Sequence, residues 1–489
     1  MWYHSARPVS AKYLCIHGHF YQPPRENPWT GAIERQPSAG DDHDWNERIA
    51  RECYGPNGHA RAGERLVNNY ARMSFNFGPT LLSWWESQRP QEYARILEAD
   101  AESARRLGGH GNALAQAYGH PILPLTPERD RVTQVRWGLR DFEHRFGRKA
   151  EALWLPECAA DAATLRLLAE HGLKYAVLSP AQARLVRPAG GAWREVADGS
   201  VETRRPYRWW AGRPGRSPSL SLFFYDGSLS QAVAFGGLMK DAERAADELS
   251  RRFASDLDEP ELVTVCTDGE SYGHHEKFAD LGLAWLLHEA GPKRGLEPVN
   301  FGWFLEKHPP KWEAQIVEGS SWSCAHGLTR WSGDCPCGVA EGGHARWRAP
   351  LREALEWLRG RLDTVYEEKA GALFADPWEA RDDLFGWENR LKKGARPGDA
   401  RRLLEMERLS LYMFTSCAWF FSDLGIEAAQ NLKYAARAVE LAGQAAGVDL
   451  ESELLRRLEM VESSDPSVGT AAAVYRTGSA GRAASSSRT

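Results

Sequence analysis

Short apolar runs alternate with helical patterns through the N-terminal two thirds of the chain. Each run is bounded by glycine, proline or polar residues, which is typical of buried strands; the runs cover residues 13–19, 152–155, 175–178, 222–225 and 262–266. Residues 91–107 place apolar side chains at helical spacing. Strands that alternate with helices predict a parallel sheet, and the length of this part of the chain favours a barrel over an open sheet.

The segment 149–178 shows this alternation most clearly. A strand is followed by a helix that Asp161 can cap and Gly172 can end, and then by a second strand. Residues 188–220 are rich in glycine, proline, arginine and tryptophan, so we expect them to form a surface excursion from the barrel.

The C-terminal third has a helical pattern. One apolar stripe runs through Leu351, Leu355, Leu358, Leu362 and Val365. Asp376 and Pro377 form a helix start, and residues 401–443 and 449–462 are also helical in pattern. We therefore expect a barrel over residues 1–318, a helical region over 319–464 and, from its Ser/Ala/Gly/Arg-rich composition, a disordered tail over 465–489.

Composition and charge exclude several classes of protein. The chain has 489 residues, 43% of them hydrophobic, and a net charge of −5, so no general basic field favours nucleic acid or an anionic membrane. No apolar run has the length of a membrane span, and residues 1–8 carry no signal-peptide core. The eight cysteines are scattered and read as reduced thiols, so we expect a cytoplasmic protein.

Two carboxylates directly follow predicted strands. Glu157 comes after the run 152–156, and Asp268 comes after the run 263–267. Catalytic side chains of α/β barrels lie at the C-terminal ends of the strands, and a pair of acids suits glycoside hydrolysis. Either acid alone could equally be a surface helix cap. The pair is more informative in a chain with 20 tryptophans, because sugars stack on exposed aromatic rings.

Other polar and aromatic residues cluster near the same strand ends. His17 and His19 share one strand face, which suits sugar recognition or metal binding unless one is core and the other solvated. Residues 118–121 predict a sharp turn that presents His120, although an ordinary turn fits the same residues. Further candidates for substrate binding are Gln22, Trp154, Glu270 and His274, the last two in a loop that also carries Asp268 and His275.

Three thiols and one imidazole form the best candidate for a metal site. Cys324, His326, Cys335 and Cys337 could make a tetrahedral zinc site. The Cys-x-His and Cys-x-Cys spacings are tighter than the usual two-residue gaps, which favours a loop without metal. We therefore expect no stoichiometric metal.

The order of these motifs resembles glycoside hydrolase family 57 over residues 12 to about 310. The resemblance rests on His17-x-His19 with Gln22-Pro23, Gly119-His120-Pro121, Trp154-Leu155-Pro156-Glu157 and Asp268-Gly269-Glu270-x-Tyr272-Gly273. That family contains α-amylases, amylopullulanases, 4-α-glucanotransferases, glycogen branching enzymes and some α-galactosidases. The resemblance implies an incomplete seven-stranded (β/α) barrel followed by a helical region.

The resemblance also implies roles for individual residues. Glu157 matches the family's nucleophile and Asp268 its general acid/base, while His17, His19 and His120 match positions that line the substrate site. Phe20 and Tyr21 separate His19 from Gln22, which departs from the usual first motif. The implied activity is that of a retaining glycosidase or transglycosylase on α-glucan, with no cofactor or metal.

Two alternatives remain at this point. One is a metal-dependent sugar hydrolase, α-mannosidase-like or a deacetylase, with His17, His19 and His274 or His275 as ligands. No aspartate follows His19 closely, which speaks against it. The other is a glycan-binding protein whose barrel has lost activity.

Residues from about 320 resemble a domain of unknown function that follows this catalytic domain in one bacterial subgroup. The segments 321–327 and 415–421 carry the resemblance. The domain usually runs further, so we expect a truncated form, with the family's fifth motif near Trp419 and Asp423. The apolar stripes need a partner, and we expect the helical region to pack on the C-terminal rim of the barrel, with Trp322 or Trp419 facing sugar subsites.

Overall fold

The computed structural model describes residues 11–253, 259–339, 341–383 and 385–479. Within these, a parallel sheet has the order β12-β1-β4-β5-β6, and the parallel bridge between Ala152 and Tyr175 continues it to β7 and β11. The seven strands are β1 (Lys12–Phe20), β4 (Ser74–Phe77), β5 (Ala113–Gln116), β6 (Leu153–Trp154), β7 (Tyr175–Leu178), β11 (Ser219–Phe224) and β12 (Glu261–Asp268). The predicted parallel barrel is confirmed.

The barrel is not closed between β11 and β12, the two strands at the ends of this order. In the described residues no strand ladder joins β11 to β12. Asp226, just after β11, instead reaches the middle of β12 through a hydrogen bond from its amide to the Thr264 carbonyl at 2.9 Å. A sheet edge left open in this way needs another partner, and β10 (Tyr207–Trp210) supplies it by pairing antiparallel with β11.

This extension corrects one prediction. Residues 188–220 contain β9 (Arg194–Glu195) and β10, which join β8 (Ala183–Pro188) and β14 (Trp312–Ile316) in the second sheet. The segment is therefore partly a sheet and not only a surface excursion. Its glycines and prolines form the turns, while Tyr207 and Trp209 are buried in the core.

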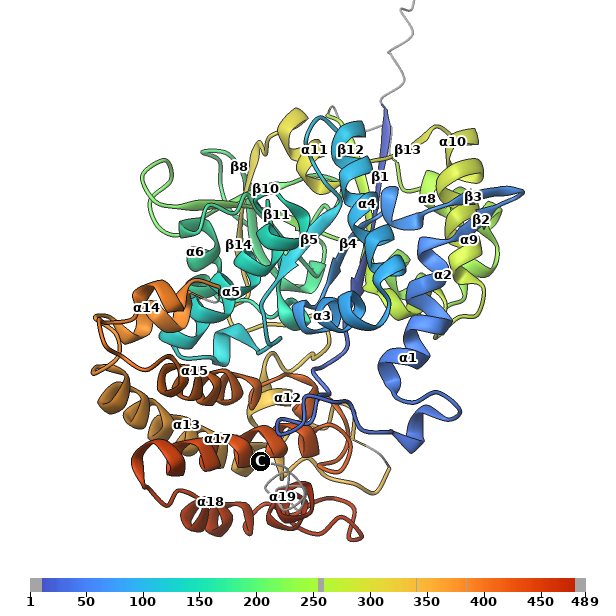
Figure 1. The fold of residues 1–489 in the computed structure, drawn as a ribbon. Helices are drawn as coiled ribbons and strands as arrows, with labels where there is room; N and C mark the ends of the chain where they lie inside the picture. The colour runs from blue at the N-terminus through green and yellow to red at the C-terminus, as the bar shows by residue number, and fades with distance from the viewer. Residues whose placement is uncertain (1–10, 254–258, 340, 384, 480–489) are drawn as a thin grey trace, which may run out of the picture.

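Helices connect the parallel strands and cover the outside of the barrel (Figure 1). The main ones are α3 (Pro79–Gln88), α4 (Pro90–Arg106), α5 (Glu128–Phe146), α6 (Ala162–Glu170), α7 (Gly227–Ala234), α8 (Ala242–Ser250) and α9 (Ala279–Trp285). Asp161 caps α6 as predicted, because its side chain accepts a hydrogen bond from the Thr164 amide. The predicted helix 91–107 is α4.

The C-terminal helices form a separate layer below the barrel in Figure 1. They are α13 (Arg348–Ala370), α14 (Pro377–Asp382), α15 (Pro397–Tyr412), α16 (Cys417–Phe420), α17 (Ala428–Ala446), α18 (Glu451–Leu458) and α19 (Ala471–Ser479). The predicted stripe from Leu351 to Val365 is buried, and Asp376 caps α14.

Two predictions about this region are wrong in part. The segment 401–443 is not helical throughout, because α15 ends at Tyr412 and α17 begins at Ala428, with only the short α16 between them. The tail predicted to be disordered contains α19, whose Ala471, Ala472 and Tyr475 are buried. A small-residue face packs closely on a neighbouring helix, which composition alone does not reveal. Residues 480–489 and 1–8 lie outside the described residues.

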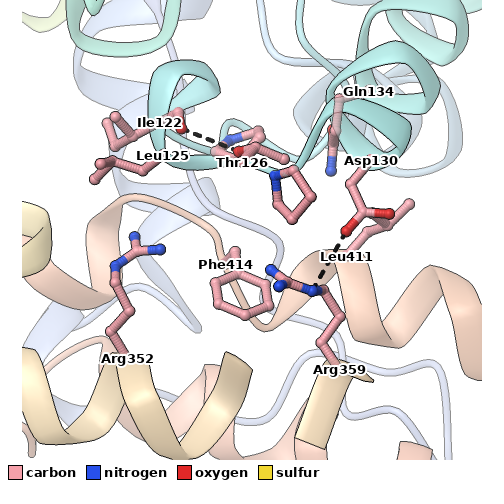
Figure 2. A pocket seen from close by; sticks show the side chains of 11 residues that line it. Ile122, Leu125, Thr126, Asp130, Gln134, Arg352, Arg359, Leu411 and Phe414 are labelled. Atoms are coloured by element: carbon pink, nitrogen blue, oxygen red, sulfur yellow. Dashed lines mark hydrogen bonds and ion pairs between the residues drawn. The ribbon is translucent and has the colours of Figure 1, made fainter. Parts of the chain in front are cut away.

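The helical layer packs against the loops that follow β5 and β6. Pro121 forms a bridge with Thr415, and Ala160 forms one with Ser320. Figure 2 shows a small pocket between the two parts, with Ile122, Leu125 and Gln134 on the barrel side and Arg352, Leu411 and Phe414 on the other. The predicted packing on the C-terminal rim is confirmed.

A buried ion cluster joins the two parts. Arg381 pairs with Asp130 at 2.9 Å and with Glu407 at 2.8 Å, and all three side chains are at most 5% exposed. Arg359 adds a longer pair with Asp130 at 3.7 Å. Removal of one partner from such a cluster leaves a buried charge without compensation, so the cluster ties α14 and α15 to α5.

In the described part of the chain, no helix combines the length and the apolar character that crossing a membrane requires.

Candidate active site

Hydrogen-bonded side chains from adjacent strand ends form a polar layer at the C-terminal end of the barrel. His19 pairs in register with Asn76 of β4 and with Asp268 of β12. His17 contacts Ser74 Oγ at 3.0 Å and Asn76 Oδ1 at 3.1 Å, and Asn76 donates to Gln116 Oε1 at 2.6 Å. The predicted shared face of His17 and His19 is therefore present, and both imidazoles are buried.

His120 completes this layer from the turn after β5. Its backbone is left-handed, with a φ of 54°. Its ring stacks on Tyr21 at 3.8 Å, and its Nε2 lies 3.3 Å from Nε2 of His19. Burial lowers the pKa of His17 to about 3 and of His19 to about 4, and it lowers the pKa of His120 as well. All three are neutral at neutral pH and act as hydrogen-bonding groups.

Trp154 forms the floor under these histidines. Its indole is almost fully buried and stacks on His17 at 4.1 Å. The chain then turns sharply, because Pro156 is followed by Glu157 in the left-handed region, with φ 56° and ψ 22°. A non-glycine residue rarely adopts this conformation, and the Trp322 amide supports it with a hydrogen bond to the Glu157 carbonyl at 3.0 Å.

Two donors from one loop hold the carboxylate of Glu157. Its Oε2 accepts from Ser323 Oγ at 2.6 Å and from Trp322 Nε1 at 3.2 Å. Burial raises the pKa of Glu157 above its ordinary value, and the bonds from Ser323 and Trp322 offset only part of that rise. The two donors favour the ionised form against the burial.

Asp268 ends β12 and carries a strongly perturbed carboxyl group. Its pKa is raised well above the usual range by desolvation, then by the charge of Glu270 and then by that of Glu157. Asp268 is exposed to solvent, so we attribute the rise of its pKa mainly to the charges of the two neighbouring carboxylates. Gly269 behind it must lack a side chain, since a Cβ there would lie 2.1 Å from the Phe20 ring. Glu157 and Asp268 thus differ in protonation tendency while lying within electrostatic reach.

Gln22 and Glu270 lie behind Asp268 in a second polar cluster. Gln22 Nε2 contacts Glu270 Oε1 at 3.4 Å, and the Tyr54 hydroxyl also donates to that oxygen. Burial raises the pKa of Glu270 to about 7. His274, from the same loop, instead pairs with Glu52 at 2.5 Å and is half-buried.

Sequence reasoning missed several residues of the site. Asn76 is the penultimate residue of β4 and Gln116 the last of β5, but both strands have only four residues, so the strand-end rule that found Glu157 does not single them out. Tyr225 follows β11, and its ring lies 6.3 Å from that of Trp322. Ser416 Oγ binds His120 Nδ1 at 2.7 Å from the helical layer, and no local signal marks that long-range contact.

Trp419 and Asp423, which the sequence placed near the family's fifth motif, lie outside this polar layer. Trp419 is fully buried and donates to the Arg348 carbonyl at 3.0 Å, so it faces the helical core. Asp423 accepts hydrogen bonds from Ser463 and from backbone amides of the following turn. Of the two tryptophans expected near the site, only Trp322 is there.

The described residues contain one group that could hold a metal ion, namely Cys324, His326, Cys335 and Cys337. His17 and His19 are engaged with Ser74 and Asn76 instead. A carboxylate held by two donors beside a carboxyl of raised pKa can serve as nucleophile and proton donor, respectively.

Comparison with known proteins gives two family matches. A model described as glycosyl hydrolase family 57 matches residues 47–311. A model described as a domain of unknown function (DUF3536) matches residues 344–387 and 388–488.

Individual relatives are distant. The chain is 28% identical over 109 residues to alpha-amylase 1 of Dictyoglomus thermophilum, and this alignment covers 22% of this chain and 15% of that protein. It is 25% identical over 291 residues to a 1,4-alpha-glucan branching enzyme of Thermococcus kodakarensis, and this alignment covers 46% of this chain and 42% of that protein. Among solved structures, an exo-type maltose-forming amylase from Pyrococcus sp. ST04 has a TM-score of 0.67 at 17% identity, over 91% of this chain and 82% of that chain.

Proposed function

The chain belongs to glycosyl hydrolase family 57, and on that basis we propose that it is a retaining glycoside hydrolase or transglycosylase that acts on α-glucan. One observation carries the proposal. Glu157 and Asp268 influence each other electrostatically, yet donors from Trp322 and Ser323 favour the ionised form of the first, and acidic neighbours favour the protonated form of the second.

The proposed reaction uses this difference. Glu157 attacks the anomeric carbon while the proton of Asp268 passes to the departing glycosidic oxygen, which leaves a glycosyl-enzyme and an ionised Asp268. Asp268 then takes a proton from water or from an acceptor hydroxyl, whose oxygen attacks the anomeric carbon and releases Glu157. Each cycle restores both protonation states.

The neutral histidines have a separate role in the proposal. His19 and His120 lie next to each other and are uncharged, so they can donate to or accept from sugar hydroxyls without adding charge beside the developing oxocarbenium ion. Trp154 and Tyr21 restrict their rings by stacking. We propose His17, Gln22, Glu270 and His274 as outer supports of this site.

The names of the relatives support the substrate class. They describe an alpha-amylase, a 1,4-alpha-glucan branching enzyme and an exo-type maltose-forming amylase. The alignments with the two curated relatives span less than half of their length, so the substrate of the whole protein is part of the proposal. We also propose a cytoplasmic location, since all eight cysteines are free thiols.

The metal-dependent alternative is less well supported. A catalytic zinc needs three protein ligands around an open position. His17 and His19 instead bond to Ser74 and Asn76, and His274 pairs with Glu52.

A product profile tests the proposal and separates it from an inactive glycan-binding protein. The enzyme and its Glu157→Gln variant are incubated with amylose, maltoheptaose and glycogen, and reducing ends and branch points are counted. We expect turnover by the wild type and a loss of at least about a thousandfold in the variant. Glu170→Gln, on the exposed surface of α6, is the control and should retain activity. No change in any of the three glucans would contradict the proposal.

A further inference from the structure

A compact group of sulfur and nitrogen atoms lies in the loop between β14 and α13. Cys324 Sγ is 3.6 Å from Cys335 Sγ and 3.9 Å from Cys337 Sγ. His326 Nδ1 is 3.5 Å from Cys335 Sγ and 3.4 Å from Cys337 Sγ. All four ligand atoms lie within 4.8 Å of one another.

These distances match a tetrahedral metal centre. Bonds of about 2.3 Å to sulfur and 2.0–2.1 Å to nitrogen place two sulfurs about 3.8 Å apart, and a sulfur and a nitrogen about 3.6 Å apart, around one zinc ion. A disulfide needs about 2.05 Å between sulfurs, which neither of these sulfur pairs approaches. Three thiols and an imidazole select a soft or borderline metal over magnesium or calcium.

We propose that Cys324, His326, Cys335 and Cys337 bind one zinc ion in a structural site. Four protein ligands close the coordination sphere, which is the arrangement of structural and not catalytic zinc. In the sequence, the one-residue gaps in Cys324-x-His326 and Cys335-x-Cys337 favoured a loop without metal. In the fold, one pair comes from each of two loop segments that face each other, so those spacings do not prevent a tetrahedral arrangement.

The surroundings suit the charge of such a site. Three thiolates and one Zn²⁺ carry a net charge of −1, and buried Arg348 lies beside it. Its guanidinium donates to the Cys335 carbonyl at 2.8 Å and to the Cys337 carbonyl at 3.3 Å. It also reaches the Phe421 carbonyl at 3.1 Å, which fixes the second ligand pair against the helical layer. Outer hydrogen bonds of this kind orient metal ligands.

The site has a consequence for catalysis that rests on the proposed function. Trp322 and Ser323, which hold the Glu157 carboxylate, immediately precede the ligand Cys324. Arg330 donates to the Ser323 carbonyl at 3.3 Å from the same loop. A zinc ion bound there would anchor the segment whose Trp322 and Ser323 hold the carboxylate of Glu157.

Metal analysis tests the site independently of any activity. We expect about one zinc per chain in protein purified without added metal, and at least a tenfold lower content in Cys337→Ser after dialysis against a chelator. Cys417→Ser is the matched control, because Cys417 is also partly exposed and also lies in the C-terminal region. It should keep its zinc. Wild-type protein that holds no zinc even after refolding with the ion, or that forms a disulfide within the cluster, would overturn the proposal.

Cobalt substitution gives a second readout if the variant does not fold. Wild-type protein stripped of metal and reloaded with Co²⁺ should show the thiolate-to-cobalt charge-transfer band and the visible bands of tetrahedral cobalt. Octahedral cobalt spectra, or titration of the bands to well below one equivalent, would contradict a Cys₃His site.

Discussion

The carboxylate of Glu157 has two hydrogen-bond donors, whereas Asp268 has two carboxylates as neighbours. Such opposite environments separate the pKa values of two acids that are chemically almost identical. Individual side chains can therefore be changed to move one limb of the pH profile without touching the reacting groups.

Ser323→Ala should move the acid limb of kcat/KM to higher pH. The lost hydroxyl stabilised the ionised Glu157, so the pKa of Glu157 rises and the nucleophile becomes protonated earlier as pH falls. We expect a shift of about one unit, which corresponds to about 1.4 kcal/mol. Ser332→Ala, at an exposed position at the end of α12 (Thr329–Ser332), should leave the profile unchanged. An unshifted acid limb in Ser323→Ala would show that this bond does not tune Glu157.

Glu270→Gln should move the alkaline limb to lower pH. The charge of Glu270 raises the pKa of Asp268, so its removal lowers that pKa and the proton donor is lost at lower pH. The pH dependence of kcat/KM on maltoheptaose measures this shift. Glu276→Gln is the control, because Glu276 lies in the same loop but pairs with Lys240 at 3.0 Å. An alkaline limb that stays in place or moves upward would exclude Asp268 as the titrating acid.

At the scale of elements, the length of each strand explains which site residues the sequence predicted and which it missed. β1 and β12 are long apolar runs, and β6 precedes a sharp turn at Pro156 and Glu157, so their polar ends stand out in the sequence. β4 and β5 have four residues each, and their Asn76 and Gln116 resemble ordinary loop residues. Ser416 reaches His120 from a segment almost 300 residues away, and periodicity does not encode such a contact.

Arg381→Met tests how the helical layer is held to the barrel. The substitution leaves Glu407 buried without its cation and Asp130 with only the longer pair to Arg359, so we expect a loss of about 3–5 kcal/mol in the free energy of unfolding. Arg390→Met is the control, because its pair with Asp383 is 41% exposed on the arginine side, and it should cost at most about 1 kcal/mol. Chemical unfolding of both variants measures the difference. Equal midpoints would show that the buried cluster does not stabilise the contact.

At the scale of the whole molecule, the barrel and the helical layer form one functional unit. Ile122 and Ala159 of the barrel belong to the apolar core of the helical layer. Trp322, Ser323 and Ser416 reach the site from beyond residue 318. The sequence predicted a barrel, a helical region and their packing at the rim, but it gave no sign of the individual contacts that Ser323 and Ser416 make.

A fragment of residues 1–318 should therefore be insoluble or inactive. It lacks both donors to Glu157 and exposes the apolar surface that the helical layer covers. Expression of the fragment beside the full chain, with activity measured on amylose, tests this. A soluble fragment with full activity on long glucans would show that the helical layer is dispensable.

Azide rescue tests the assignment of the two carboxylates most directly. Glu157→Ala and Asp268→Ala are each incubated with an activated α-glycoside and sodium azide, and the anomeric configuration of the glycosyl azide is read by NMR. If Glu157 is the nucleophile, azide in Glu157→Ala attacks the substrate directly and gives the β-azide. In Asp268→Ala, azide attacks the glycosyl-enzyme and gives the α-azide. The reverse pattern, or near-native activity of Glu157→Ala without azide, would contradict the account.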